Sequence, residues 1–142
     1  MPSASRTVEI SAPISAVYAF FTDPANDPKW RGGVKEMLLD GQPRVGAVVR
    51  RVVAGPGGRS IDANVEITEL TAPTRYASKT VTGPVRPVGI YSFVSAGDRT
   101  RVTFSLDVEV SGLKKLFMGG PVQKSMDGEM AALDKAKELL ES

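Results

Sequence analysis

The sequence predicts an α+β fold in which an antiparallel sheet of six to seven strands packs against a long C-terminal helix. Two observations lead to this prediction. Through the middle of the chain, short segments alternate apolar and polar residues and are separated by turns rich in glycine and proline, a pattern typical of antiparallel strands. Residues 122–140 instead carry apolar residues at spacings of three and four, as an amphipathic helix does.

The N-terminal part predicts one strand followed by two short helices. Residues 1–5 are expected to be a loose terminus, and the alternation over 7–11 predicts the strand. Pro13 suits the first turn of a helix, and Pro24 ends it because the residue before a proline avoids the helical conformation. The buried stripe of this helix is predicted from Val17, Phe20 and Phe21. A turn then leads to Trp30.

The middle of the chain predicts the rest of the sheet. Further strands are expected at 34–39, 47–54, 61–68, 74–81, 88–95 and 102–110. The connections are short, so consecutive strands are expected to pair in antiparallel fashion. Alternation is clearest in the last strand, where Val102, Phe104 and Leu106 are predicted to face the core. The paired acids Asp107 with Glu109, and Asp62 with Glu66, fall on the opposite, solvent-facing side.

The C-terminal helix is predicted to begin after Pro121, whose missing N–H is harmless at a helix start. Its apolar face comprises Val122, Met126, Met130, Leu133, Ala136 and Leu140. Nothing in the sequence suggests a linker, so residues 1–142 are expected to form a single domain.

Composition excludes several kinds of chemistry. The chain has no cysteine and no histidine, so neither a Ser-His-Asp nor a Cys-His catalytic arrangement is available, and the usual zinc ligands are missing. No metal and no cofactor is expected. The net charge of +2 is small and its basic residues are scattered, which argues against nucleic-acid binding. With no membrane-spanning segment and no cysteine, a cytoplasmic location is expected, while the oligomeric state (monomer or homodimer) stays open.

Several short motifs stand in a fixed order from about residue 6 to residue 141. They are Val8-Glu9-Ile10-Ser11-Ala12-Pro13, Val17-Tyr18, Phe21-Thr22-Asp23-Pro24, Trp30, Gly41 with Val45-Gly46, Tyr91-Ser92-Phe93 and Gly97-Asp98-Arg99-Thr100-Arg101-Val102. In this order the chain resembles the SRPBCC superfamily, which includes START lipid-transfer domains, plant pathogenesis and pollen-allergen proteins, and the polyketide cyclase/dehydrase group. The resemblance implies a helix-grip fold: a curved antiparallel sheet around the C-terminal helix, with a hydrophobic cavity between them.

Eight residues are candidates for contact with a ligand in such a cavity. They are Trp30, Arg50, Tyr76, Tyr91, Phe93, Phe104, Met126 and Met130. Aromatic rings and flexible thioethers suit an apolar cavity wall, and a few polar groups would orient the ligand.

The orientation of several candidates stays open in the sequence. Trp30 either plugs the core or lies at the cavity mouth. Tyr76 shares a face with Ser78 and Thr80 that is either cavity-lining or convex, and the phase of Tyr91 and Phe93 is ambiguous. Either Arg50 or Arg51 must point inward.

Three functions follow as hypotheses. The first is binding of a hydrophobic small molecule, whether a lipid, a polyketide or an aromatic compound. The second is an enzyme of the polyketide cyclase/dehydratase type, in which Tyr76, Tyr91 or Arg50 polarises a carbonyl; no catalytic constellation decides whether the chain is an enzyme. The third is a protein-interaction or chaperone-cofactor module with a filled cavity, contacting its partner through Leu116, Phe117 and Met118.

Overall fold

A computed structural model describes residues 3–83, 85–108 and 123–142. Its strands are β1 (Ser3–Ile10), β2 (Val34–Leu38), β3 (Val48–Ala54), β4 (Ser60–Asp62), β5 (Val65–Thr71), β6 (Arg75–Thr80), β7 (Val88–Ala96) and β8 (Arg99–Asp107). Its helices are α1 (Ile14–Thr22), α2 (Asp27–Trp30) and α4 (Leu133–Glu141), with short 3₁₀ turns η1 (Pro24–Asn26) and η2 (Pro56–Gly58). None of these described helices is long and apolar enough to cross a bilayer.

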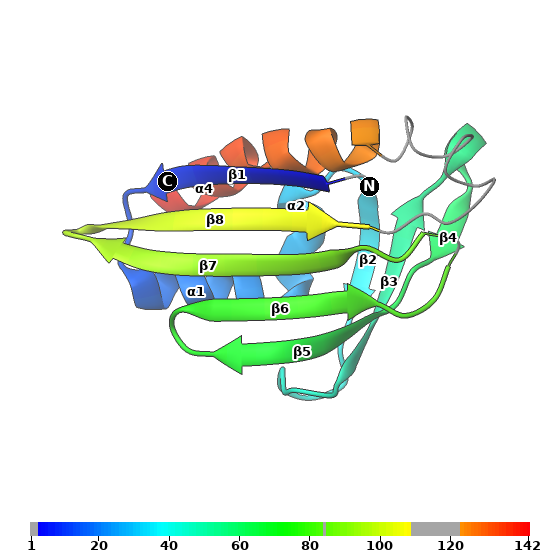
Figure 1. The fold of residues 1–142 in the computed structure, drawn as a ribbon, viewed down its shortest axis with the longest axis horizontal. Helices are drawn as coiled ribbons and strands as arrows, with labels where there is room; N and C mark the ends of the chain where they lie inside the picture. Colours follow the sequence, from blue (N-terminus) through cyan, green and yellow to red (C-terminus); the bar gives the residue numbers. More distant parts are fainter. Residues whose placement is uncertain (1–2, 84, 109–122) are drawn as a thin grey trace.

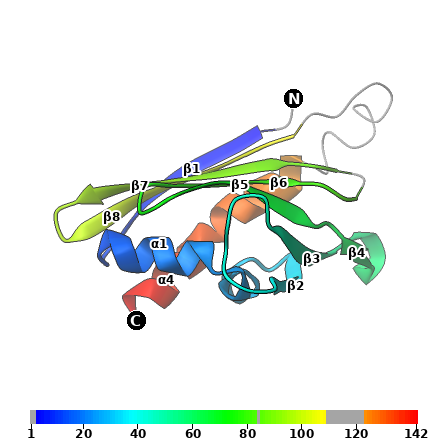
Figure 2. The ribbon, with the colours of Figure 1, turned by 90° about the horizontal axis from the view of Figure 1, so that it is seen from below.

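One antiparallel sheet forms the body of the molecule (Figure 1). Its strands follow the order β1-β8-β7-β6-β5-β3-β2, and β4 pairs with β3 beside this path. Seen from below, the sheet curves, and α1 and α4 lie on the same face of it (Figure 2). The predicted fold class, a curved antiparallel sheet with a long C-terminal helix, is confirmed.

The first strand begins earlier than its alternation indicates. The chain pairs with β8 from Ser3 onward, where Ser3 lies opposite Asp107. The side-chain amide of Gln123 also accepts a hydrogen bond from the Ser3 N–H at 3.1 Å and donates one to the Ser3 carbonyl at 2.7 Å. The prediction of a loose terminus over 1–5 is therefore wrong from Ser3 onward, because tertiary contacts order this segment.

The strand predicted at 61–68 is divided into β4 and β5. The break lies at Ala63 and Asn64, where the Asn64 side-chain oxygen accepts a hydrogen bond from the Arg51 N–H at 3.1 Å. The Ala63 N–H in turn donates to the Arg51 carbonyl at 2.9 Å. The Asn64 side chain thus takes the place of a backbone carbonyl in pairing with β3. The alternation of apolar and polar residues alone does not show such a break.

The C-terminal helix is present as predicted, with one irregularity. Residues 123–131 and α4 are helical and are separated by Ala132 alone, whose N–H still donates to the Gly128 carbonyl at 3.0 Å. Four predicted core residues of this helix are buried: Met126, Met130, Leu133 and Ala136. Leu140 is half-buried, and Val122 lies outside the described residues.

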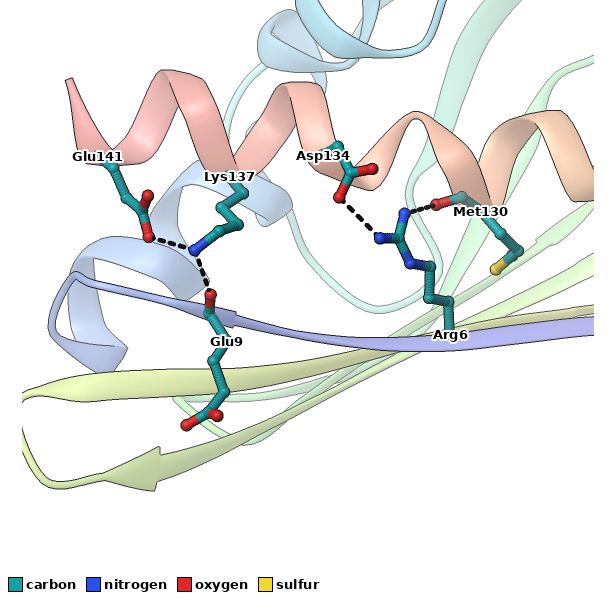
Figure 3. Close-up of polar contacts among 6 residues, drawn as sticks. All are labelled: Arg6, Glu9, Met130, Asp134, Lys137 and Glu141. Carbon is teal, nitrogen blue, oxygen red and sulfur yellow. Dashed lines mark hydrogen bonds and ion pairs between the residues drawn. The ribbon is translucent and has the colours of Figure 1, made fainter.

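Side-chain contacts hold this helix along β1, an edge strand of the sheet (Figure 3). Arg6 donates to the Met130 carbonyl at 3.1 Å and pairs with the Asp134 carboxylate at 2.7 Å. Farther along, the Lys137 ammonium donates to the Glu9 carbonyl at 2.8 Å. The helix therefore covers an edge whose backbone groups would otherwise be open to pairing with another chain.

Candidate functional site

A row of three aromatic rings crosses the concave face of the sheet. Tyr76 on β6 lies opposite Tyr91 on β7, and Tyr91 lies opposite Phe104 on β8. The ring centroids of Tyr76 and Tyr91 are 5.6 Å apart and those of Tyr91 and Phe104 are 4.3 Å apart, with nearly parallel planes. All three side chains are buried. The open question of phase is thereby settled: Tyr76, Tyr91 and Phe93 face inward.

Two helical aromatic residues pack onto this row. Phe21 of α1 contacts Tyr91 at a centroid distance of 5.2 Å, and Trp30 of α2 meets Phe21 edge-on at 5.5 Å and Phe104 at 6.1 Å. Trp30 is only 3% exposed, so it acts as the core plug, the first of its two predicted roles.

A buried ionic cluster lies beside the aromatic row. The Arg31 guanidinium pairs with the Asp27 carboxylate at 3.0 Å, one helical turn earlier, and with the Glu129 carboxylate of the C-terminal helix at 2.6 Å. It also lies 5.7 Å from the centre of the Trp30 ring and 5.8 Å from that of Phe104. Arg31 therefore joins α2, the sheet and the C-terminal helix at one point.

The inward-pointing arginine of β3 is Arg51. Arg51 is 8% exposed, whereas Arg50 lies on the solvent face, so the candidate Arg50 is corrected to Arg51. Residues 48–53 read Val-Val-Arg-Arg-Val-Val, and each face of the strand thus carries one arginine between two valines. Alternation within this segment gives both faces the same composition, so the sequence does not choose between them.

Arg51 is bound only by uncharged groups among the described residues. Its Nε donates to the Ala63 carbonyl at 2.9 Å and its Nη2 to the Thr80 hydroxyl at 2.9 Å. No carboxylate of the described chain lies within 4.0 Å of it. Burial and the nearby Arg31 lower the pKa of Arg51 to about 10, so the guanidinium stays protonated at neutral pH.

These residues surround a small cavity, here called the inner cavity. Its volume is about 20 Å³, enough for about one water molecule. The lining residues combine an ionic end, a hydroxyl-bearing strand and an aromatic wall: Asp27, Arg31, Met37, Arg51, Val65, Tyr76, Ser78, Thr80, Pro87, Gly89, Tyr91, Phe104 and Leu106. The mixed face of Tyr76, Ser78 and Thr80 is thus cavity-lining. The cavity is nearly filled by the protein's own side chains.

Tyr91 carries an unsatisfied hydroxyl into this environment. Its oxygen is buried and has no hydrogen-bond partner among the described residues. Burial raises the pKa of Tyr91 well above its usual value, and burial likewise raises the pKa of Tyr76, so both phenols are neutral donors. An unpaired buried hydroxyl is costly and rare in native proteins, so this one indicates a place for a partner that the described residues do not supply.

Asp27 is the unusual acid of the site. Burial raises its pKa to about 6, and this effect outweighs the opposing influence of Arg31. A carboxyl group that titrates near neutral pH inside a cavity is able to accept and return a proton under ordinary conditions.

The eight predicted ligand residues divide into three groups. Tyr76, Tyr91 and Phe104 line the inner cavity. Trp30, Phe93, Met126 and Met130 are buried in the core but do not line it, and Arg50 is exposed. The roles of the seven buried residues as ligand contacts remain predictions.

Sequence reasoning missed Asp27, Arg31 and Met37. The first two had a signal, since an aspartate and an arginine four residues apart after a helix start suggest an ion pair. Met37 is hidden by a bulge in β2: the register shifts between Val34 and Glu36, so Val34 and Met37 both point inward although they are three residues apart.

The other predicted acids lie away from the site. Asp62 and Asp107 are exposed and Glu66 is half-buried, while Glu109 lies outside the described residues. Within the described ranges, no cluster of three acidic, histidine or cysteine side chains is placed to hold a metal ion.

Comparison with known families identifies the chain. Residues 1–141 match the family described as polyketide cyclase / dehydrase and lipid transport. The chain belongs to this family. The resemblance to the SRPBCC superfamily is thereby confirmed. A comparison with curated protein sequences finds no match.

Solved structures of this family's fold are similar over nearly the whole chain. TTHA0849 from Thermus thermophilus superposes with a TM-score of 0.79 at 21% identity, covering 96% of this chain and 95% of that one. A START superfamily protein from Mycobacterium smegmatis gives 0.78 at 21% identity, covering 98% and 97%. The di-domain ARO/CYC BexL from the BE-7585A biosynthetic pathway gives 0.70 at 19% identity, covering 99% of this chain and 50% of that one. At these identities the likeness establishes the fold alone.

Proposed function

We propose that the protein binds an apolar, aromatic small molecule that carries an oxygen acceptor, and that this acceptor lies in the inner cavity. The observation that carries the proposal is the buried Tyr91 hydroxyl without a described partner, on the wall of an aromatic cavity. Ligand pockets typically combine apolar walls with a few convergent polar groups.

Arg51 supports the same assignment. Its described partners are a carbonyl and a hydroxyl, so its charge is not matched by a described carboxylate. A ligand carbonyl or carboxylate oxygen would accept hydrogen bonds from Arg51 and Tyr91 together. Apolar burial against the aromatic row would supply most of the affinity, because the walls there are rings.

Three probes of similar size and shape test for the oxygen acceptor: 4-ethylbenzoate, 4-ethylacetophenone and 1,4-diethylbenzene. Trp30 is the single tryptophan of the chain and packs on Phe104, so its fluorescence reports binding. One of the two oxygen-bearing probes will bind the parent more tightly than the other. We expect Tyr91→Phe to lower the affinity for that probe about tenfold, the effect of one lost hydrogen bond. The hydrocarbon should bind the variant as well as it binds the parent.

Tyr18→Phe is the matched control, since Tyr18 packs on Phe93 but does not line the inner cavity. Stronger binding of the benzoate indicates an anionic head group, and stronger binding of the ketone a neutral one. If each of the three probes binds the parent and the Tyr91→Phe variant with equal affinity, the proposal that a ligand oxygen accepts a hydrogen bond from Tyr91 is refuted.

Asp27 favours a second candidate, an enzyme that acts next to a carbonyl. With a pKa near 6, the Asp27 carboxylate would remove a proton from the carbon beside a ketone, while Tyr91 and Arg51 hold the resulting enolate oxygen. The protonated Asp27 carboxyl then exchanges its proton with solvent and returns one to the same carbon, which regenerates the ketone and completes the exchange.

The test is hydrogen–deuterium exchange of the methyl ketone of 4-ethylacetophenone in D₂O, followed by NMR. We expect Asp27→Asn to reduce any protein-catalysed exchange to the rate of buffer, while the ketone still quenches or shifts Trp30 emission. If the ketone exchanges at the buffer rate in the presence of the parent protein, the enzyme hypothesis is refuted and the binding proposal alone stands.

The interaction-module hypothesis rests on Leu116, Phe117 and Met118, which lie outside the described residues. The nearly filled inner cavity agrees with it, and a pull-down would test it.

The cytoplasmic location inferred from the sequence belongs to the proposal, and cell fractionation checks it.

A further inference from the structure

A second, larger hollow lies on the outside of the molecule, and we call it the outer groove. It runs between the end of α1 with η1 and the end of β2 with the loop that follows. Its volume is about 480 Å³, and its walls combine polar and apolar surface in about equal measure, with Ala19, Pro24, Leu38, Leu39 and Pro43 among the apolar residues. Asp23 is the only charged residue among the described groups that line it.

Met37 is common to the outer groove and the inner cavity. It is the one residue that lines both hollows among the described residues. Its side chain is 6% exposed, and in the sheet it lies directly opposite Arg51. Met37 therefore lies where the inner cavity, near Arg51, and the groove that opens to solvent come together.

For the proposed ligand to enter the inner cavity, this boundary has to move. The inner cavity holds about one water molecule, too little for any organic ligand. The outer groove alone reaches the range of roughly 300–1,000 Å³ that ligand pockets occupy. Methionine is unbranched and has three rotatable side-chain bonds, so Met37 is well suited to turn aside without a change in the backbone.

We infer that the inner cavity and the outer groove are two halves of one binding site separated by Met37. The inner half takes an oxygen-bearing aromatic head group at Arg51 and Tyr91, and the groove takes an apolar tail that extends past Met37. The ligand class is accordingly an amphipathic molecule longer than the inner cavity. This inference rests on the proposed function and adds the course and length of the ligand.

Two probes with the same head group test the tail, namely 4-ethylbenzoate and 4-octylbenzoate. Ala19→Phe places a ring in the groove from an exposed position of α1, and Ala16→Phe places one on the same helix at an exposed position that does not line the groove. By calorimetry we expect the parent to bind the octyl probe at least tenfold more tightly than the ethyl probe. Ala19→Phe should remove most of this advantage, and Ala16→Phe should retain it.

The methionine itself is followed by NMR of ¹³C-methyl-labelled protein, in which Met37→Leu identifies the Met37 signal. We expect the octyl probe to shift this signal strongly, and Met37→Ala to bind the octyl probe several-fold more tightly. The inference is overturned if Ala19→Phe and Met37→Ala leave the octyl affinity unchanged while Tyr91→Phe still weakens both probes. If only the ketone 4-ethylacetophenone binds, 4-octylacetophenone takes the place of the octyl probe in the same tests. Failure of the benzoates and of the ketone to bind at all would instead refute the proposed function, and the inference with it.

Discussion

At the scale of the single residue, Tyr91 carries a hydroxyl that the folded chain leaves unpaired among its described residues. Removing one unsatisfied buried group relieves its desolvation cost. Tyr91→Phe is therefore expected to unfold in urea with a free energy equal to that of the parent or higher by about 1 kcal/mol. A loss of more than about 1 kcal/mol would show that the hydroxyl has a structural partner.

Asp27 makes the free energy of unfolding depend on pH with a sign opposite to that of most acidic residues. Its folded pKa of about 6 lies above its ordinary value of 3.8, so the folded protein holds a proton that the unfolded chain has released. Its contribution to stability is complete below about pH 4, falls as the pH rises through this window, and is lost above about pH 6. The charged groups that face it are Arg31, Glu129 and Arg51.

Asp27→Asn isolates this effect. From pH 5 to pH 7.5 the parent should lose about 1 kcal/mol of unfolding free energy relative to the variant. The chain has no histidine, so little else titrates in this interval to obscure the comparison. Urea unfolding at the two pH values measures it, and parallel curves for both proteins would contradict a raised pKa.

Residue-level sequence reasoning named the aromatic residues of the wall, although it left the facing of Tyr76 and Tyr91 open, and it missed most of the charges. Tyr76, Tyr91 and Phe104 belong to strands whose alternation brings them to one face, so their types and spacing are informative. Arg51 has a twin in Arg50, and only the sheet register separates the two. Glu129 becomes a site residue through a contact across 98 positions, which no local pattern reveals.

At the scale of the element, the irregular segments are where prediction failed. The helix and most strands follow from period and turn residues, because each buries one face. The bulge in β2 and the break between β4 and β5 depend on partners in β3, so they appear only in the paired sheet. The bulge is also what turns Met37 inward to the boundary between the inner cavity and the outer groove.

The C-terminal helix offers a comparison between a buried and an exposed attachment. Glu129 binds Arg31, whose side chain is 9% exposed, whereas Asp134 binds Arg6 with side-chain exposures of 66% and 35% (Figure 3). A hydrogen bond to a buried charge is worth roughly 1.5–3 kcal/mol, and an exposed ion pair less than about 1 kcal/mol.

We therefore expect Glu129→Gln to increase hydrogen exchange of the amides in 123–131 by about tenfold or more, and Asp134→Asn to have little effect. Mass spectrometry of exchanged peptides measures both variants of the same helix. Equal exchange in the two would show that apolar burial of Met126 and Met130, and not the ion pair, fixes the helix.

At the scale of the whole molecule, a ligand in the proposed site would touch the sheet, α1 and β2 at once. Because these contacts exist only in the folded state, binding should stabilise the entire domain by about 2.7 kcal/mol at a concentration one hundred times the dissociation constant. For a chain of this size that corresponds to a rise in Tm of about 5–10 °C. Calorimetric scans with 4-octylbenzoate check this value against the affinity measured separately. A probe that alters Trp30 emission without raising Tm would be binding the unfolded chain equally well, and would therefore not occupy a site made by the fold.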